Sequence, residues 1–160
     1  MIFLASVSVS AQKQGKEKID SLLTAAKETK NDSLKVWLYK EIAFNYWSID
    51  PNKGIEYAQK GLKIAKWSGM KKGESEIFNS LGVLHWVKGD YSAALEYYHN
   101  ALKINESLKD TNAVAKNLGN IALIYKNMKN NAKALENLNR AMDINEKLLK
   151  KGLEHDFYSF

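Results

Sequence analysis

Residues 81–102 read LGVLHWVKGDYSAALEYYHNAL, and this stretch decides the fold. Leu81, Gly82 and His85 recur at helical spacing, and the pair Gly89-Asp90 interrupts the pattern. Asp90 is suited to cap a second helix, because its carboxylate accepts hydrogen bonds from free backbone N–H groups. A second stripe at helical spacing follows, formed by Tyr91, Ala94, Leu95, Tyr98, Ala101 and Leu102. The stretch therefore predicts two helices joined by a tight turn.

The helix pair recurs along the chain. Residues 94–108 align with residues 134–148, a spacing of 40 that pairs Ala94 with Ala134 and Ile104 with Ile144. The same spacing relates residues 54–64 to residues 94–104, whereas the helix before them is offset by 39. Repetition at a fixed period of this length is typical of stacked helical repeats.

The composition agrees with an all-α protein. The chain has 160 residues, of which 45% are hydrophobic and 26% charged, with one proline and nine glycines. An all-β fold would need many more turn residues. The sequence contains no cysteine, which excludes disulfides and thiolate metal sites.

No residue pattern points to catalysis, a cofactor or a metal. The histidines His85, His99 and His155 form no pair at a metal-binding helical spacing, and the isolated glycines form no phosphate-binding loop. We expect His85 to lie in the core and His99 to face solvent. The sequence therefore predicts a non-enzymatic protein without cofactor or metal.

The net charge of +6 raises the question of nucleic-acid binding. The lysines are spread along the chain, and the densest groups (Lys13, Lys16, Lys18 and Lys147, Lys150, Lys151) do not form a long basic run. We expect a solvated lysine-rich surface and no nucleic-acid partner.

The repeated residues resemble the tetratricopeptide repeat signature. The resemblance is carried by Leu81-Gly82, Gly89-Asp90-Tyr91, Ala94-Leu95-Glu96-Tyr97-Tyr98 and Ala101-Leu102 in the middle unit. The third unit is also similar, the first only loosely. The family's proline after the second helix is absent, His85 stands at a usual tyrosine, and the period exceeds the usual 34 residues. We therefore expect a long-helix variant, with the extra residues in the second helices.

The resemblance implies an all-α, right-handed α-solenoid of stacked antiparallel helix pairs. Its repeats are expected at residues 33–70, 71–110 and 111–150, with the start of a truncated fourth repeat at 151–160. Residues 12–32 are expected to form an N-terminal capping helix, because terminal repeats need their apolar face covered. The residues suited to this cover are Ile19, Leu22, Leu23 and Ala26.

The first residues bear on localisation. Residues 1–11 read MIFLASVSVSA, which are apolar, small and uncharged. The run is too short to span a bilayer, and it fits a signal-peptide remnant with cleavage before Gln12. The alternative is a hydrophobic first turn. The first reading predicts an exported, periplasmic protein, and the second leaves a cytoplasmic one.

A candidate binding surface lies on the first helix of each unit, because these helices line the inner face of a solenoid. The candidate groove residues are Trp37, Lys40, Phe44, Trp47, Asn79, Val83, Trp86, Lys116, Leu123 and Lys126. Glu76 and Gly119 belong to the same rows. The rim lysines would favour an acidic ligand or a C-terminal carboxylate. In the alternative interpretation Trp37 and Phe44 pack under the N-terminal helix, and Trp47 covers the Asp50-Pro51 turn.

Two functions follow as hypotheses. In the first, the chain binds a protein or peptide partner in its concave groove and is the exported sensory or scaffold part of a larger signalling protein, with a kinase or DNA-binding output domain downstream. This hypothesis rests on resemblance to such bacterial regulators. In the second, the chain is a free-standing adaptor or chaperone-like assembly factor.

Overall fold

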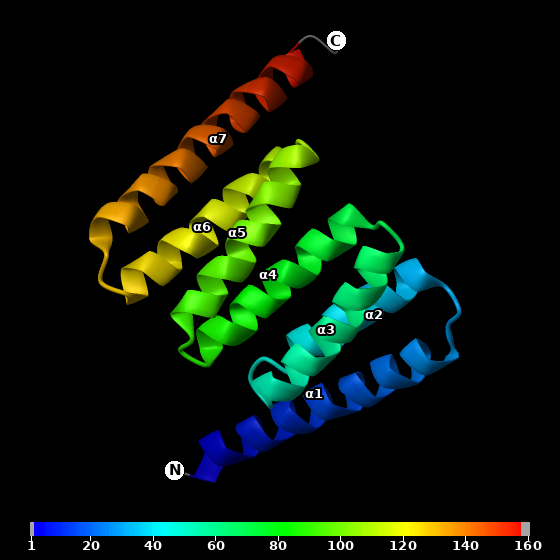
Figure 1. Ribbon diagram of the computed structural model, residues 1–160. Coiled ribbons are helices and arrows are strands. Elements are labelled where there is room, and N and C mark those ends of the chain that lie inside the picture. The colour runs from blue at the N-terminus through cyan, green and yellow to red at the C-terminus, as the bar shows by residue number, and fades with distance from the viewer. Residues whose placement is uncertain (1, 158–160) are drawn as a thin grey trace.

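The computed structural model describes the backbone of residues 2–157 and the side chains of residues 15–150. Within this range the chain is an all-α solenoid without strands, as the sequence predicts. Figure 1 shows the helices stacked side by side, with α1 and α7 at opposite ends. The helices are α1 (Ile2–Glu28), α2 (Asp32–Asn45), α3 (Pro51–Trp67), α4 (Lys71–Val87), α5 (Tyr91–Ser107), α6 (Thr111–Asn127) and α7 (Asn131–Phe157).

Short polar side chains start most of these helices. Asn31, Asp50, Asp90 and Asp110 each accept a hydrogen bond from the backbone N–H three residues later. These bonds satisfy donors that the first helical turn leaves free. Both helices of the second unit, α4 and α5, have 17 residues. In the first unit α3 has 17 residues and α2 has 14. The expectation that the extra length lies in the second helices therefore fails in the second unit, where both helices are equally long, and agrees with the first unit.

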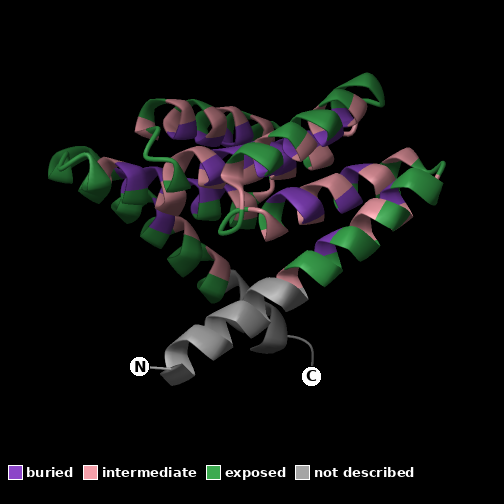
Figure 2. Ribbon diagram, turned by 90° about the horizontal axis from the view of Figure 1, so that it is seen from below, coloured by how far each residue is buried: buried purple, intermediate pink, exposed green. Residues whose placement is uncertain are grey.

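The core runs between successive helix pairs rather than around one centre. Helices α2 and α3, α4 and α5, and α6 and α7 pack as hairpins, and each hairpin also packs against the next. Figure 2 shows the buried residues along the helix faces that meet, with exposed residues on the outside. One cluster joins the first two units around Ile77 and Leu81, and another joins the last two around Leu118 and Ile121.

Helix α1 covers the first unit. Ala26 is buried with Leu38 and Ile42 of α2, and Leu22 and Leu23 pack against the same cluster. Ile19 is also fully buried. Burying these apolar side chains stabilises the open end of the solenoid.

The terminal helices extend across two expected boundaries. Helix α1 is continuous through residues 11 and 12, and α7 is continuous through residues 150 and 151. No turn therefore separates the expected segments, although both regions are helical. The signal-peptide prediction for residues 1–11 and the fourth-repeat prediction for residues 151–160 fall on side chains outside the described range. None of the helices, as far as the structure describes them, has the apolar length that a membrane span requires.

Candidate functional site

A groove of about 450 Å³ lies along the first helices of the three units. Most of its lining residues lie on α2, α4 and α6, and Asn105 of α5 and Asp110 before α6 complete the lining. The lining residues are Lys40, Glu41, Phe44, Lys72, Ser75, Glu76, Asn79, Ser80, Val83, Asn105, Asp110, Ala113, Lys116 and Asn120. Ligand pockets in proteins have volumes of roughly 300–1,000 Å³, so this groove can hold part of a peptide.

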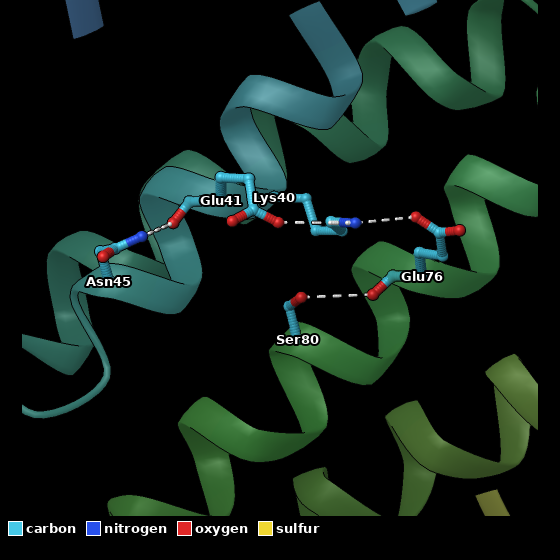
Figure 3. Close-up of polar contacts among 5 residues, drawn as sticks. All are labelled: Lys40, Glu41, Asn45, Glu76 and Ser80. Carbon is cyan, nitrogen blue, oxygen red and sulfur yellow. Dashed lines mark hydrogen bonds and ion pairs between the residues drawn. The ribbon is translucent and has the colours of Figure 1, made fainter. Parts of the chain in front are cut away.

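The charges of the groove are balanced. Figure 3 shows Lys40 of α2 reaching across to Glu76 of α4, with Nζ 3.1 Å from Oε2, while the Glu41 carboxylate lies 3.6 Å away. The lining contains three lysines (Lys40, Lys72, Lys116) and three carboxylates (Glu41, Glu76, Asp110). The sequence suggested a basic rim that selects an acidic ligand. The structure differs, because Lys40 is already paired with two carboxylates.

A chain of hydrogen bonds lies beneath the groove. The Ser75 hydroxyl donates to Asn105 Oδ1 at 2.6 Å, and Asn105 Nδ2 donates to Asn117 Oδ1 at 2.6 Å. Asn117 Nδ2 then donates to Asn79 Oδ1 at 2.7 Å. Asn79 Nδ2 closes the chain on the Ser75 carbonyl at 3.3 Å. We call these four residues the amide relay; it links α4, α5 and α6.

The structure brings together half of the candidate residues. Lys40, Phe44, Asn79, Val83 and Lys116 line the groove. The other five candidates, which do not line it, are Trp37, Trp47, Trp86, Leu123 and Lys126.

The alternative interpretation of the aromatic residues can be compared with their exposure. Phe44 and Trp37 are 56% and 46% exposed, so neither is buried beneath α1. Trp47 is also largely exposed. Among the histidines, His99 faces solvent as expected. His85 is half-buried against the Tyr97 ring.

Three polar residues of the amide relay were not predicted from the sequence. Ser75, Asn105 and Asn117 are buried and were not among the candidates, because helical periodicity assigns their positions to the core. A signal was present at the repeat offset. The equivalent residues one unit earlier are Val36, Ala65 and Ile77, so three apolar positions become polar together.

The side chains around Trp86 indicate that it stabilises the fold. It is half-buried and packs against the cluster formed by α5, α6 and α7. We expect Trp86→Ala to lower the free energy of unfolding by about 2 kcal/mol, below the 3–5 kcal/mol typical of a fully buried tryptophan. Urea unfolding measures this value. A loss under about 0.5 kcal/mol, together with weaker partner binding, would instead assign Trp86 to the ligand surface.

The stacked helix pairs and the groove on their first helices define a helical repeat scaffold. Residues 74–147 match the family model described as tetratricopeptide repeat, so this part of the chain, the second and third units, is a tetratricopeptide repeat region. Repeats of this family generally mediate protein–protein interaction, and the fold is typically a non-catalytic scaffold. No cluster of metal-ligating side chains occurs among residues 15–150.

Solved structures share this fold. The crystal structure of BtubC (BKLC) from P. vanneervenii is similar with a TM-score of 0.73 and 21% sequence identity. The similarity covers 88% of this chain and 58% of that one, so the chain spans little more than half of its length. At this identity the likeness concerns the fold alone. No curated protein sequence matches the chain.

Proposed function

We propose that the chain is a protein-interaction module that binds a segment of a partner protein in the groove formed by α2, α4 and α6. The observation that carries this proposal is the groove itself, which is lined by three successive repeat units. A groove of this kind suits an extended peptide or a helix, because either can contact all three units at once.

The lining also suggests where a ligand is anchored. Phe44 is 56% exposed although it lines the groove, and Val83 lies on the neighbouring helix at the equivalent position. Exposed aromatic residues at the centre of interfaces often contribute most of the binding energy. We therefore assign the apolar anchor of the ligand to Phe44, with Val83, which is half-buried against the core of the second and third units, beside it.

The wider role is proposed in two forms. The apolar, uncharged residues 1–11 favour an exported sensory or scaffold part of a larger signalling protein. The alternative is a free-standing adaptor or chaperone-like assembly factor. A coding sequence that continues into a membrane span and an output domain supports the first form. A capping helix followed by a stop codon supports the second.

The groove is tested with a displayed library of random seven-residue peptides, selected on the wild-type chain. We expect Phe44→Ala to weaken binding of a selected peptide at least tenfold, about 1.4 kcal/mol, because the anchor is lost. Since Phe44 is largely exposed, the thermal midpoint of the Phe44→Ala variant should stay near that of the wild type. Trp67→Ala is the matched control, because Trp67 is 83% exposed and lies outside the groove.

Two results would contradict the proposal. One is selection of peptides whose affinity is equal for wild type and Phe44→Ala. The other is tight binding of a DNA duplex that weakens steeply with salt, since this would make the positive charge the functional feature.

A further inference from the structure

Three buried residues are apolar at the junction between the first two units, and their equivalents at the next junction are polar. Between the first and second units they are Val36, Ala65 and Ile77, which are 5%, 0% and 0% exposed. Between the second and third units the equivalent residues, at offsets of 39, 40 and 40, are Ser75, Asn105 and Asn117. These are 1%, 3% and 0% exposed.

Packing alone does not account for the polar set. The chain itself shows that three aliphatic residues fill this junction, since Val36, Ala65 and Ile77 belong to one continuous core cluster. Burying hydroxyl and amide groups costs free energy unless each is hydrogen-bonded, and apolar replacements of similar shape are often neutral or stabilising. The polar set therefore has a role besides filling space.

The relay fixes the orientation of one groove residue. Each carboxamide oxygen in the relay accepts from the preceding side chain, so Asn79 turns its Oδ1 toward Asn117 and its Nδ2 toward the Ser75 carbonyl. A carboxamide nitrogen carries two N–H donors, and the bond to Ser75 uses one of them. Because Asn79 lines the groove, we infer that the second N–H faces the ligand space. Preorganised donors bind more strongly, since no side-chain freedom is lost on binding.

We propose that Asn79 is a fixed hydrogen-bond donor for a main-chain carbonyl of an extended peptide, and that Ser75, Asn105 and Asn117 are positioning residues for it. The inference rests on the proposed peptide-binding function of the groove. The ligand group is an uncharged carbonyl rather than a carboxylate, because Lys40, which lines the groove at the equivalent position of α2, is held by Glu41 and Glu76, and the lining carries balanced charge.

The test replaces the polar residues between the second and third units with the aliphatic residues found between the first and second units. The triple variant Ser75→Val, Asn105→Ala, Asn117→Ile replaces the relay with residues that the chain already uses at this position. We expect its thermal midpoint to be no lower than that of the wild type, and its affinity for a peptide selected from the random library to fall at least tenfold. Adding Asn79→Ala to the triple variant should cause no further loss, because Asn79 is already released.

A second variant keeps the test decisive if the triple variant does not fold. Asn79→Asp retains the shape of the side chain and removes the N–H donor, so it should also weaken binding at least tenfold. The wild type should bind the peptide equally, within twofold, with a C-terminal amide or a free carboxylate.

Three results would overturn the inference. Unchanged affinity of the triple variant or of Asn79→Asp would make the relay purely structural, while peptide binding by the groove would stand. A strong preference for the free carboxylate would assign a different ligand group. If no peptide is selected on the wild type, the proposed function itself fails.

Discussion

Replacing Gly82 with alanine should lower the free energy of unfolding by about 2 kcal/mol, although alanine is the better helix former. A Cβ atom at this position would lie 2.6 Å from Tyr98 Cε1 and 2.8 Å from two further ring atoms. Tyr98 is 2% exposed, and burial raises the pKa of its phenol, so the ring is enclosed and neutral. Helices α4 and α5 must therefore separate to admit the methyl group.

The chain offers a matched control for this substitution. Gly119 also lies within a helix, but outside the adjoining backbone of that helix no atom lies within 4 Å of the place where its Cβ would be. Gly119→Ala should stabilise the protein by roughly 0.5–1 kcal/mol, because only the backbone entropy of glycine changes. Both values follow from urea unfolding. If Gly82→Ala is as stable as Gly119→Ala, the close approach of α4 and α5 is not a determinant of the fold.

A second substitution should partly restore the Gly82→Ala variant. Forty residues later the equivalent pair is Ala122 and Leu138, so a larger first residue is combined with a smaller partner. Gly82→Ala with Tyr98→Leu should therefore lose less than the sum of the two single changes. Such coupling is expected for residues in direct contact.

The repeat architecture could be predicted because its signals are local and periodic. Apolar stripes at helical spacing locate the helices, and aspartates such as Asp90 and Asp110 mark where the next ones begin. Recurrence at 40 residues then shows that one hairpin is stacked three times. None of these signals depends on the conformation of a single side chain.

Some turns could not be predicted. Gly69 and Gly89 adopt positive φ of 68° and 77°, as glycine readily does. Lys109 and Lys129, forty residues later, adopt φ of 57° and 59°. Lysine gives no indication of this conformation, which lets the N–H groups of Asp110 and Asn130 bond back to the carbonyls of Asn105 and Tyr125 at the helix ends.

The groove residues were only partly predictable, because the surroundings of a position on one helix depend on whether another helix packs beside it. Asn79 faces α6, where it meets Asn117. Gly119 is the equivalent residue of α6, yet nothing lies near its Cβ position. Leu123 of the same helix likewise lies outside the groove. The repeat offset thus identifies equivalent positions, but not which of them have a neighbouring helix to face.

The pairing of Lys40 illustrates a further limit. The sequence places a lysine on the inner face, and the structure shows it bonded to Glu76 on another helix and beside Glu41 on its own. Such pairing depends on side-chain rotamers and on the distance between two units. Charge balance in the groove therefore had to be read from the structure.

Placing an asparagine like Asn117 in the apolar junction between the first two units should cause the largest loss of stability. We expect Ile77→Asn to lower the free energy of unfolding by about 4 kcal/mol or more, since it removes apolar burial worth about 2–5 kcal/mol and leaves an amide without partners at about 1–3 kcal/mol. Ile77 is 0% exposed, and it shares its cluster with Val36 and Ala65, which cannot hydrogen-bond through their side chains.

Ile77→Val is the control, with an expected loss of about 0.5–1.5 kcal/mol at the same site. Adding Val36→Ser and Ala65→Asn to Ile77→Asn copies the hydrogen-bond chain of the second junction, in which Ser75 donates to Asn105 and Asn105 donates to Asn117. This triple variant should recover part of the loss in urea unfolding. If Ile77→Asn costs less than about 1 kcal/mol, the junction accepts an amide without partners, and the polar residues under the groove then need no hydrogen-bond network to explain them.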